Sequence, residues 1–130
     1  MRGQFILLAI VGLFFSGAAW AESIEGAANW TALDAAAKRG YVMGVMDKTL
    51  SIDEEEKEIG GCIKDVSPQA ADVVALVDQK YADPDLATIP GYIVIYRSVY
   101  EICFPYISKA DPNATAPSVY WQALKTAAAP

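Results

Sequence analysis

The chain contains two cysteines, Cys62 and Cys103, and the segment that they enclose most limits what the chain can fold into. In an exported protein of this size, two cysteines most simply form one disulfide. Closing a loop of about 42 residues would stabilise the fold by roughly 4 kcal/mol in the chain-entropy model. Two free thiols or an intermolecular bridge are the alternatives. An intrachain bridge would hold the start of one helix against the end of another, as an αα-hairpin.

The first helix of this segment is predicted from its ends and from its apolar spacing. Ser67 can act as the N-cap, because its hydroxyl can accept an unpaired backbone N–H, and Pro68 suits the first helical position. The residue before a proline avoids the α region, so the helix should end at the Ala-Asp-Pro sequence of residues 82–84. Between these ends, apolar residues recur at the spacing of a helix with one buried face: Ala70, Val73, Val74, Val77 and Tyr81.

A second apolar segment follows Pro90-Gly91 and ends near Cys103. Its composition over residues 92–96 is β-branched and aromatic, which would also suit a strand. However, an apolar segment that runs to Phe104 is long for a strand and ordinary for a helix. We therefore expect a helix that ends at Pro105. The apolar positions that repeat at three and four are Tyr92, Ile93, Tyr96, Val99, Tyr100 and Cys103.

Residues 1–21 have the pattern of a signal peptide. Arg2 supplies a positive charge, residues 5–15 form an unbroken apolar run, and Ala19-Trp20-Ala21 fits a cleavage site. The apolar run is too short to span a hydrocarbon core of about 30 Å. A buried N-terminal helix is the alternative interpretation. The pattern predicts a periplasmic or secreted protein that begins at Glu22 and has no membrane contact after cleavage.

The segment before the first cysteine predicts a helix that contains two glycines. Asn29 can cap a helix that opens at Trp30. Gly40 and Gly44 would lie on one face of it, where they would let another backbone approach closely, although each costs roughly 1 kcal/mol relative to alanine. A helix that ends or kinks at Gly40 is the alternative. The positions at helical spacing are Trp30, Leu33, Ala37, Tyr41, Val45 and Leu50.

Residues 51–61 are strongly acidic and are predicted to form a loop or a frayed short helix. Ser51 and Glu54 fit a capping box, and Gly60-Gly61 should release the chain into Cys62. One interpretation of the charge is a solvated surface, and the other is a contact surface for a basic partner. If contact with a partner is not made there, it is expected near Tyr41, Asp47 and the turn at residues 83–85. The candidate partner-binding residues are Asp53, Glu54, Glu55, Glu56, Glu58, Tyr41 and Asp47.

Charge and composition argue against several classes of function. The formal net charge is −6, and an acidic chain without a basic stripe is poorly suited to nucleic acid or to anionic membranes. The chain has no histidine, so it lacks the commonest general base and metal ligand. Without a histidine, neither cysteine has the usual base to activate it. We therefore expect that the protein is not an enzyme and that it binds neither a metal nor a cofactor.

The length of the mature chain favours a single small domain. We expect one helical domain over residues 22–110. Residues 111–130 form a tail rich in alanine and proline, in which residues 118–127 could make a short helix that docks or frays. The predicted fold is an all-α bundle of about four helices, stapled by one disulfide.

Several of these features together resemble a known family, the periplasmic immunity proteins that neutralise peptidoglycan amidase toxins delivered by type VI secretion. The resemblance spans residues 30–105, and its strongest element is the octet Gly-Tyr-Val-Met-Gly-Val-Met-Asp at residues 40–47. Cys62, the Val-Ser-Pro sequence at residues 66–68, the following helix, Pro84, Pro90, and Cys103 near Pro105 complete it. The chain departs from the family pattern at Lys38-Arg39, where family members often have a cysteine, at Gln69, and at the order of Cys103 and Pro105.

The resemblance implies a small α-helical protein that is often a homodimer and that binds a cognate effector and blocks its active site. The first hypothesis for function is therefore an exported protein-binding module of the immunity type. The second is a periplasmic acid-activated chaperone, in which protonation of the carboxylates would loosen the fold and expose its apolar faces. A hydrolase, the third, lacks a recognisable nucleophile–base pair.

Overall fold

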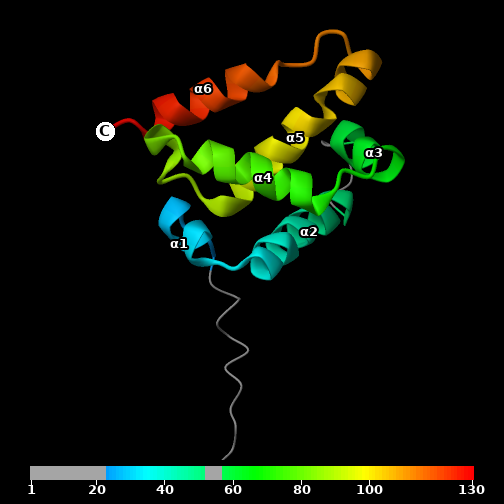
Figure 1. Ribbon diagram of the computed structural model, residues 1–130. Helices are drawn as coiled ribbons and strands as arrows, with labels where there is room; N and C mark the ends of the chain where they lie inside the picture. Colours follow the sequence, from blue (N-terminus) through cyan, green and yellow to red (C-terminus); the bar gives the residue numbers. More distant parts are fainter. Residues whose placement is uncertain (1–22, 52–56) are drawn as a thin grey trace, which may run out of the picture.

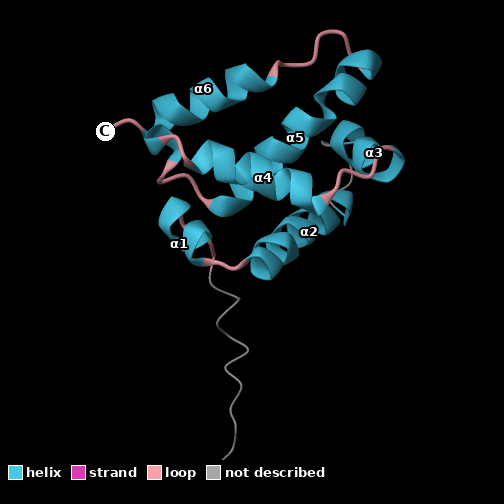
Figure 2. Ribbon diagram, viewed as in Figure 1, coloured by secondary structure: helices cyan, strands magenta, loops and turns pink. Residues whose placement is uncertain are grey.

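The structure is a computed structural model that describes residues 23–51 and 57–130 (Figure 1). The described residues contain helices and no strand (Figure 2), so the predicted all-α class is confirmed, with more helices than the four or so expected. The predicted signal peptide lies outside the described residues. The elements are α1 (Ala27–Ala32), α2 (Ala35–Ser51), α3 (Lys57–Asp65), α4 (Ala70–Tyr81), the 3-10 helix η1 (Pro84–Leu86), α5 (Gly91–Ala110) and α6 (Pro117–Ala128).

Helix α5 is the centre of the fold. Helices α2, α3, α4 and α6 all pack against it, and Figure 1 shows it crossing behind α4 towards α3. Its burial follows the three-and-four spacing of a helix, which confirms helix over strand despite the β-branched composition. Because four helices contact α5, it is buried on several sides, at Gly91, Val94, Ile95, Ser98, Val99, Tyr100, Cys103 and Ile107.

Pro105 does not end α5, contrary to the sequence prediction. The helix continues for another turn to Ala110, with Ile107 fully buried and Tyr106 bonded to Asp65 of α3. A proline inside a helix removes one backbone hydrogen bond and costs about 3 kcal/mol. Burial of the last turn against the core offsets that cost. A local sequence pattern does not show this burial, because it depends on contacts with other helices.

Helix α4 buries the face that its periodicity predicted, through Val73, Val77 and Tyr81. It ends at Tyr81, just before the predicted Ala-Asp-Pro stop. Its start was predicted wrongly, because α4 begins at Ala70 and has Gln69 as N-cap, with no side-chain cap. The hydroxyl of Ser67 therefore does not cap this helix.

Ser67 instead closes the preceding helix. It has φ 52°, a left-handed conformation, which is the usual conformation of the residue just after a helix end. In that position its N–H donates to the carbonyl of Cys62 at 3.3 Å, and the N–H of Val66 donates to the same oxygen at 2.7 Å. The end of α3 thus determines the conformation of Ser67, and a Ser67 in this conformation cannot cap α4.

The single helix predicted from Trp30 is in fact two helices. Helix α1 ends at Ala32, and α2 starts only at Ala35. The N-cap of α2 is Asp34, whose carboxylate Oδ1 accepts the backbone N–H of Ala37 at 2.8 Å. Trp30 and the glycines therefore belong to separate helices, although their spacing is continuous in the sequence.

Gly26, and not Asn29, is the N-cap of α1. The backbone here lies against the turn after η1, where the N–H of Ala27 donates to the carbonyl of Ala87 at 2.9 Å. A Cβ at Gly26 would lie 2.3 Å from that oxygen. Only glycine fits such a close approach, so tertiary contact selects where α1 begins.

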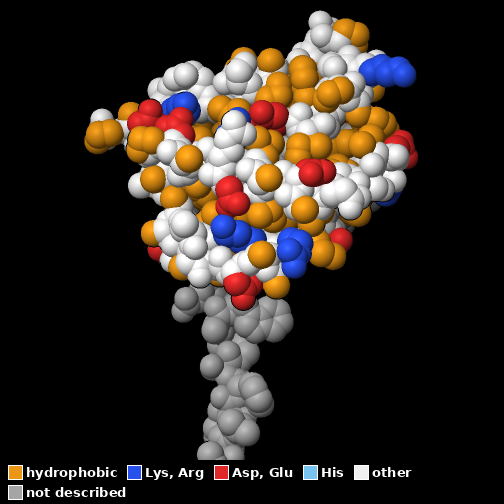
Figure 3. Space-filling view, viewed as in Figure 1, with side chains coloured by type: hydrophobic (Ala, Val, Ile, Leu, Met, Phe, Trp, Pro, Cys, Tyr) orange, Lys and Arg blue, Asp and Glu red, His pale blue; other side chains and the backbone are white. Residues whose placement is uncertain are grey.

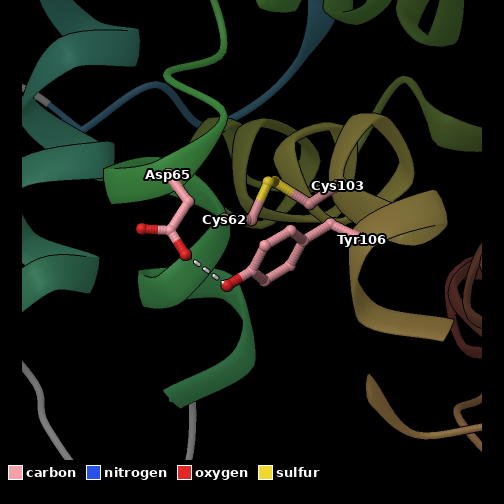
Figure 4. The surroundings of a disulfide bond; sticks show 4 residues. All are labelled: Cys62, Asp65, Cys103 and Tyr106. Atoms are coloured by element: carbon pink, nitrogen blue, oxygen red, sulfur yellow. Dashed lines mark hydrogen bonds between the residues drawn. A yellow bond between two sulfur atoms is a disulfide. The ribbon is translucent and has the colours of Figure 1, made fainter. Parts of the chain in front are cut away.

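The predicted disulfide between Cys62 and Cys103 is confirmed, across a separation of 41 residues. It does not join the ends of a hairpin as expected. It joins α3 to the body of α5, and both cysteines are fully buried. Figure 4 shows Tyr106 beside the bridge, with its hydroxyl directed at Asp65. That hydroxyl donates to the Asp65 carboxylate at 2.6 Å, so this hydrogen bond joins α3 to α5 beside the disulfide.

Gly60 and Gly61 lie inside α3 and do not release the chain as predicted. Ile59 and Cys62, on either side of them, are buried in the core. A Cβ at Gly61 would lie 3.1 Å from the Tyr106 hydroxyl. Burial of the flanking residues holds this glycine-containing turn in a helix, and the small size of Gly61 admits the tyrosine.

Two interactions of the same kind, which we call carboxylate clamps, hold the terminal helices α1 and α6 to the body of the fold, and both involve the last turn of α4. In the Asp78 clamp, the carboxylate of Asp78 on α4 accepts the indole N–H of Trp30 at 2.7 Å and the ammonium of Lys38 at 2.9 Å. The ammonium also lies 5.3 Å from the centroid of the Trp30 ring, a distance typical of a cation–π contact. The clamp joins α1, α2 and α4.

The Glu101 clamp holds the C-terminal helix. Glu101 on α5 accepts the indole N–H of Trp121 at 2.5 Å and the ammonium of Lys80 at 3.0 Å. Trp121 is buried, so α6 docks on the body of the protein. Lys125 adds an ion pair from α6 to Asp83 at 2.5 Å.

Candidate functional site

The predicted acidic contact surface lies largely outside the described residues. Asp53, Glu54, Glu55 and Glu56 belong to residues 52–56, of which the structure describes nothing. Glu58 is described and is an exposed residue in the first turn of α3.

Helix α2 runs through both Gly40 and Gly44, so it does not end at Gly40. Apart from the adjoining residues of α2 itself, nothing in the described chain lies within 4 Å of a Cβ built at either glycine. A close approach of another backbone to these glycines was one of two interpretations of the sequence. Within the described residues, no such approach occurs. The two glycines leave an open depression on the outer face of α2.

This depression is the floor of an apolar groove, which we call the glycine groove. Its volume is about 660 Å³. The walls come from two helices, since Tyr41 and Val45 belong to α2 and Tyr92 belongs to α5. The groove is lined by Ala37, Gly40, Tyr41, Gly44, Val45, Lys48 and Tyr92.

A second groove of about 520 Å³ adjoins the first and shares Val45, Lys48 and Tyr92 with it. It continues between α2 and α5 to Leu124 of α6, and Arg97 adds a second basic side chain to its lining. The two together form a continuous surface that is apolar along its length and basic in places. Burial of apolar area on such a surface is the usual driving force of protein association.

Tyr41 and Asp47, two of the predicted contact residues, lie on α2. Tyr41 is half-buried and lines the glycine groove, whereas Asp47 is exposed and is not part of its lining. Tyr92 is one of the apolar positions that repeat at helical spacing in α5, but 63% of it is exposed. Its place directly after Pro90-Gly91, at the first turn of α5, is the only sequence signal that could have suggested this exposure.

The turn at residues 83–85, the other predicted contact, has a structural role. The Asp83 carboxylate accepts the backbone N–H of Asp85 at 2.9 Å and pairs with Lys125 of α6. The hydrogen bond from Lys125 holds the pKa of Asp83 below its usual value, and the bond from the Asp85 backbone lowers it further. The side chain is thereby committed to holding η1 and α6.

The face of the molecule in Figure 3 carries acidic and basic side chains in small mixed groups among hydrophobic ones. Within residues 23–51 and 57–130, no helix has the length and hydropathy needed to cross a bilayer. Comparison of the chain with family models, with curated proteins and with solved structures finds no match. The grooves and the residues that line them are therefore the features from which a function can be inferred.

Proposed function

We propose that this chain is an exported protein-binding module of the immunity type, which inhibits a cell-wall amidase effector by covering its active site. The observation that carries the proposal is the glycine groove, an open apolar surface held by two helices of a disulfide-bridged scaffold. The octet at residues 40–47, the strongest element of the family resemblance, supplies the glycines and Tyr41. The disulfide favours an oxidising compartment such as the periplasm.

The lining of the groove suits contact with a protein. Tyr92 is 63% exposed beside an apolar floor, and tyrosines in such places are enriched among the residues that dominate binding energy. The exposed floor at Gly40 and Gly44 lets the backbone or a bulky side chain of a partner approach α2 closely. Because α2 and α5 are packed in the core, the partner would meet a preformed surface and association would require little ordering of the chain.

The test is direct binding and inhibition of an amidase effector encoded beside this gene. We expect the purified protein to form a complex with that effector and to stop its hydrolysis of peptidoglycan. Gly44→Leu, which fills the groove, and Tyr92→Ala, which removes its wall, should each weaken binding by about 30-fold, the effect of losing roughly 2 kcal/mol.

Val119→Ala is the matched control. Val119 is also an exposed hydrophobic residue, 56% accessible, but it lies on α6 away from the glycine groove. Its substitution should leave inhibition unchanged. A wild-type protein that neither binds the effector nor protects peptidoglycan would refute the proposed function, and equal binding by all three variants would refute the groove as the contact surface.

A second candidate is acid-activated binding of unfolded proteins, and the ion pair between Asp83 and Lys125 favours it. The Asp83 carboxylate holds η1 and pairs with Lys125 of α6, so its protonation would weaken the docking of α6. The pKa of Asp83 is lowered in the fold by Lys125, so its stabilisation is present above the usual value of 3.8 and is lost as the pH falls through the lowered pKa.

The two candidates are separated by acid titration. A chaperone of this kind should expose apolar surface and suppress aggregation of a client protein at about pH 3 while it is inactive at neutral pH. A protein that stays folded in acid, or that unfolds without binding clients, would exclude this candidate.

A further inference from the structure

A third concavity, which we call the polar cleft, lies among α3, α5, the α5–α6 loop and α6, and it shares Tyr96 and Arg97 with the second groove. Its volume is about 250 Å³. Unlike the glycine groove, it brings charged groups of both signs and aromatic rings together. The side chains that matter for its chemistry are Glu58, Arg97, Tyr100, Asp111, Asn113 and Tyr120.

Arg97 is the cation of the cleft, and aromatic rings position its guanidinium. The Cζ atom lies 3.7 Å from the centroid of the Tyr120 ring and 5.2 Å from that of Tyr96. No carboxylate of the described residues forms an ion pair with it. Because stacking occupies the flat face of a guanidinium, the N–H groups at its edge remain able to bind a carboxylate in two-pronged fashion.

Two carboxylates, Glu58 of α3 and Asp111 of the loop, face the same space. Burial is the main reason that the pKa of the Tyr100 hydroxyl is raised, Tyr120 and Glu58 raise it further, and Arg97 opposes them. Charges of both signs therefore act on one hydroxyl group. That hydroxyl donates to the carbonyl of Thr115 at 2.6 Å, which fixes the loop as one wall of the cleft.

We propose that the polar cleft binds a small zwitterion, an amino acid whose carboxylate pairs with Arg97 and whose ammonium pairs with Glu58 and Asp111. The volume of about 250 Å³ is smaller than the 300–1,000 Å³ or so of pockets for drug-sized ligands and suits a ligand of this size. One cation against two carboxylates leaves the cleft with an excess of negative charge. It should therefore prefer an amino acid with a second ammonium group.

Binding is tested by titration calorimetry of the full mature chain with single amino acids and with analogues that carry charge of one sign only. Lysine, alanine and glutamate are the amino-acid probes, and affinity should fall in that order. Hexanoate lacks both ammonium groups of lysine and cadaverine lacks the carboxylate, so each should bind at least about tenfold more weakly than lysine, the effect of losing a charge-assisted hydrogen bond of 1.5–3 kcal/mol or so.

Two variants test the assigned partners. Arg97→Met keeps much of the aliphatic stem and removes the guanidinium, and Glu58→Gln removes one carboxylate at an exposed position. Each should weaken lysine binding by about tenfold or more, whereas Lys109→Met, at an exposed position on the same helix that does not line the cleft, should not. Melting temperature shows whether each variant folds, and Glu58→Gln decides the question if Arg97→Met does not.

Lysine that fails to bind saturably, or cadaverine and hexanoate that bind as tightly as lysine, would overturn the proposal. It would also be overturned if Glu58→Gln bound lysine as tightly as the parent chain. Gly44 and Tyr92, the residues varied in the amidase test, do not line this cleft, so either proposal can fail without the other.

Discussion

Replacing the glycines of α2 by alanine is expected to make the protein more stable. Gly40 and Gly44 lie within a continuous helix, and apart from the adjoining backbone of α2 itself no atom of the described chain lies within 4 Å of a Cβ built at either position. Alanine therefore adds a side chain without a clash and removes the flexibility that glycine gives the unfolded chain. The gain should be about 1 kcal/mol at each position and roughly 2 kcal/mol for the pair.

Urea unfolding and thermal melting measure the effect. For a domain of this size, each kcal/mol corresponds to a rise in melting temperature of about 4–8 °C, so the double variant should differ clearly from the parent. Stability must be compared with binding in the same variants. If the groove holds a partner, Gly40→Ala and Gly44→Ala should become more stable while their affinity for the amidase falls, because each added methyl group occupies the groove.

Two other glycines provide matched controls, because the same substitution there meets a neighbour. A Cβ at Gly91 would lie 2.6 Å from the Cβ of Ile24, and overpacking of this kind costs typically 1–3 kcal/mol. A Cβ at Gly61 would lie 3.1 Å from the Tyr106 hydroxyl, so Gly61→Ala should gain less than Gly44→Ala, since the tyrosine must move.

A loss of stability in Gly40→Ala and Gly44→Ala would refute this reasoning, because it would mean that the space above α2 is filled. A second copy of the chain is one occupant that would have this effect, and the resemblance implies a homodimer. Light scattering distinguishes that case. If the parent is dimeric and Gly44→Leu is monomeric, the groove is the contact between copies.

Three further predictions concern the scaffold. Replacing both Cys62 and Cys103 by alanine should lower the free energy of unfolding by roughly 4 kcal/mol, the value for closing a loop of this length, and a loss below about 1 kcal/mol in urea unfolding would contradict it. Ser67→Gly should raise stability by up to about 1 kcal/mol, since glycine adopts the left-handed φ of 52° without strain; an unchanged urea midpoint would argue against strain at this residue. Burial raises the pKa of Tyr81 to about 12 from 10.0, so the stabilisation by its neutral hydroxyl is complete below pH 10, and roughly 2–3 kcal/mol is lost as the pH rises through 12. Tyr81→Phe should remove this alkaline dependence, and it should also lose the 2.7 Å hydrogen bond to the carbonyl of Ile89; an equal fall in stability at high pH in both proteins would assign the dependence to another group.

The sequence was sufficient where a local pattern and the core agreed. The spacing of Val73, Val77 and Tyr81 predicted the buried face of α4, and the length of the apolar segment distinguished helix from strand in α5. The number of cysteines, together with the predicted signal peptide, predicted the disulfide. In each case one physical signal was dominant and no distant contact opposed it.

The predictions that failed concern residues whose roles are set by distant contacts. Serine is a favoured N-cap residue, but Ser67 lies directly after α3. Its backbone N–H bonds to the end of α3, and it adopts the left-handed conformation typical of that position. Pro105 should break a helix, but Ile107 and Tyr106 bury the next turn. Nothing in the sequence shows that Gly26 must lie against the carbonyl oxygen of Ala87, or that Gly61 must lie against the hydroxyl of Tyr106.

The candidate site was predictable only in part. The octet identified the two glycines and Tyr41, which line one side of the groove. Tyr92, on the other side, comes from a helix about fifty residues away in the chain, and its exposure depends on how α5 crosses α2. The polar cleft had no sequence signature, because its charged residues come from three separate segments.

The carboxylate clamps also place one tryptophan in each terminal helix, so that tryptophan fluorescence can report on the docking of α1 and of α6. Of the three tryptophans in the sequence, Trp20 lies in the predicted signal peptide, and the others are the indoles of the Asp78 and Glu101 clamps. One reports on α1 and the other on α6, and each has its indole N–H bound to a carboxylate. Trp30→Phe and Trp121→Phe would therefore yield two single-tryptophan proteins whose emission follows the docking of one terminal helix each. Separation of the two signals during unfolding would show that the ends detach independently, and coincidence would show that the fold opens as one unit.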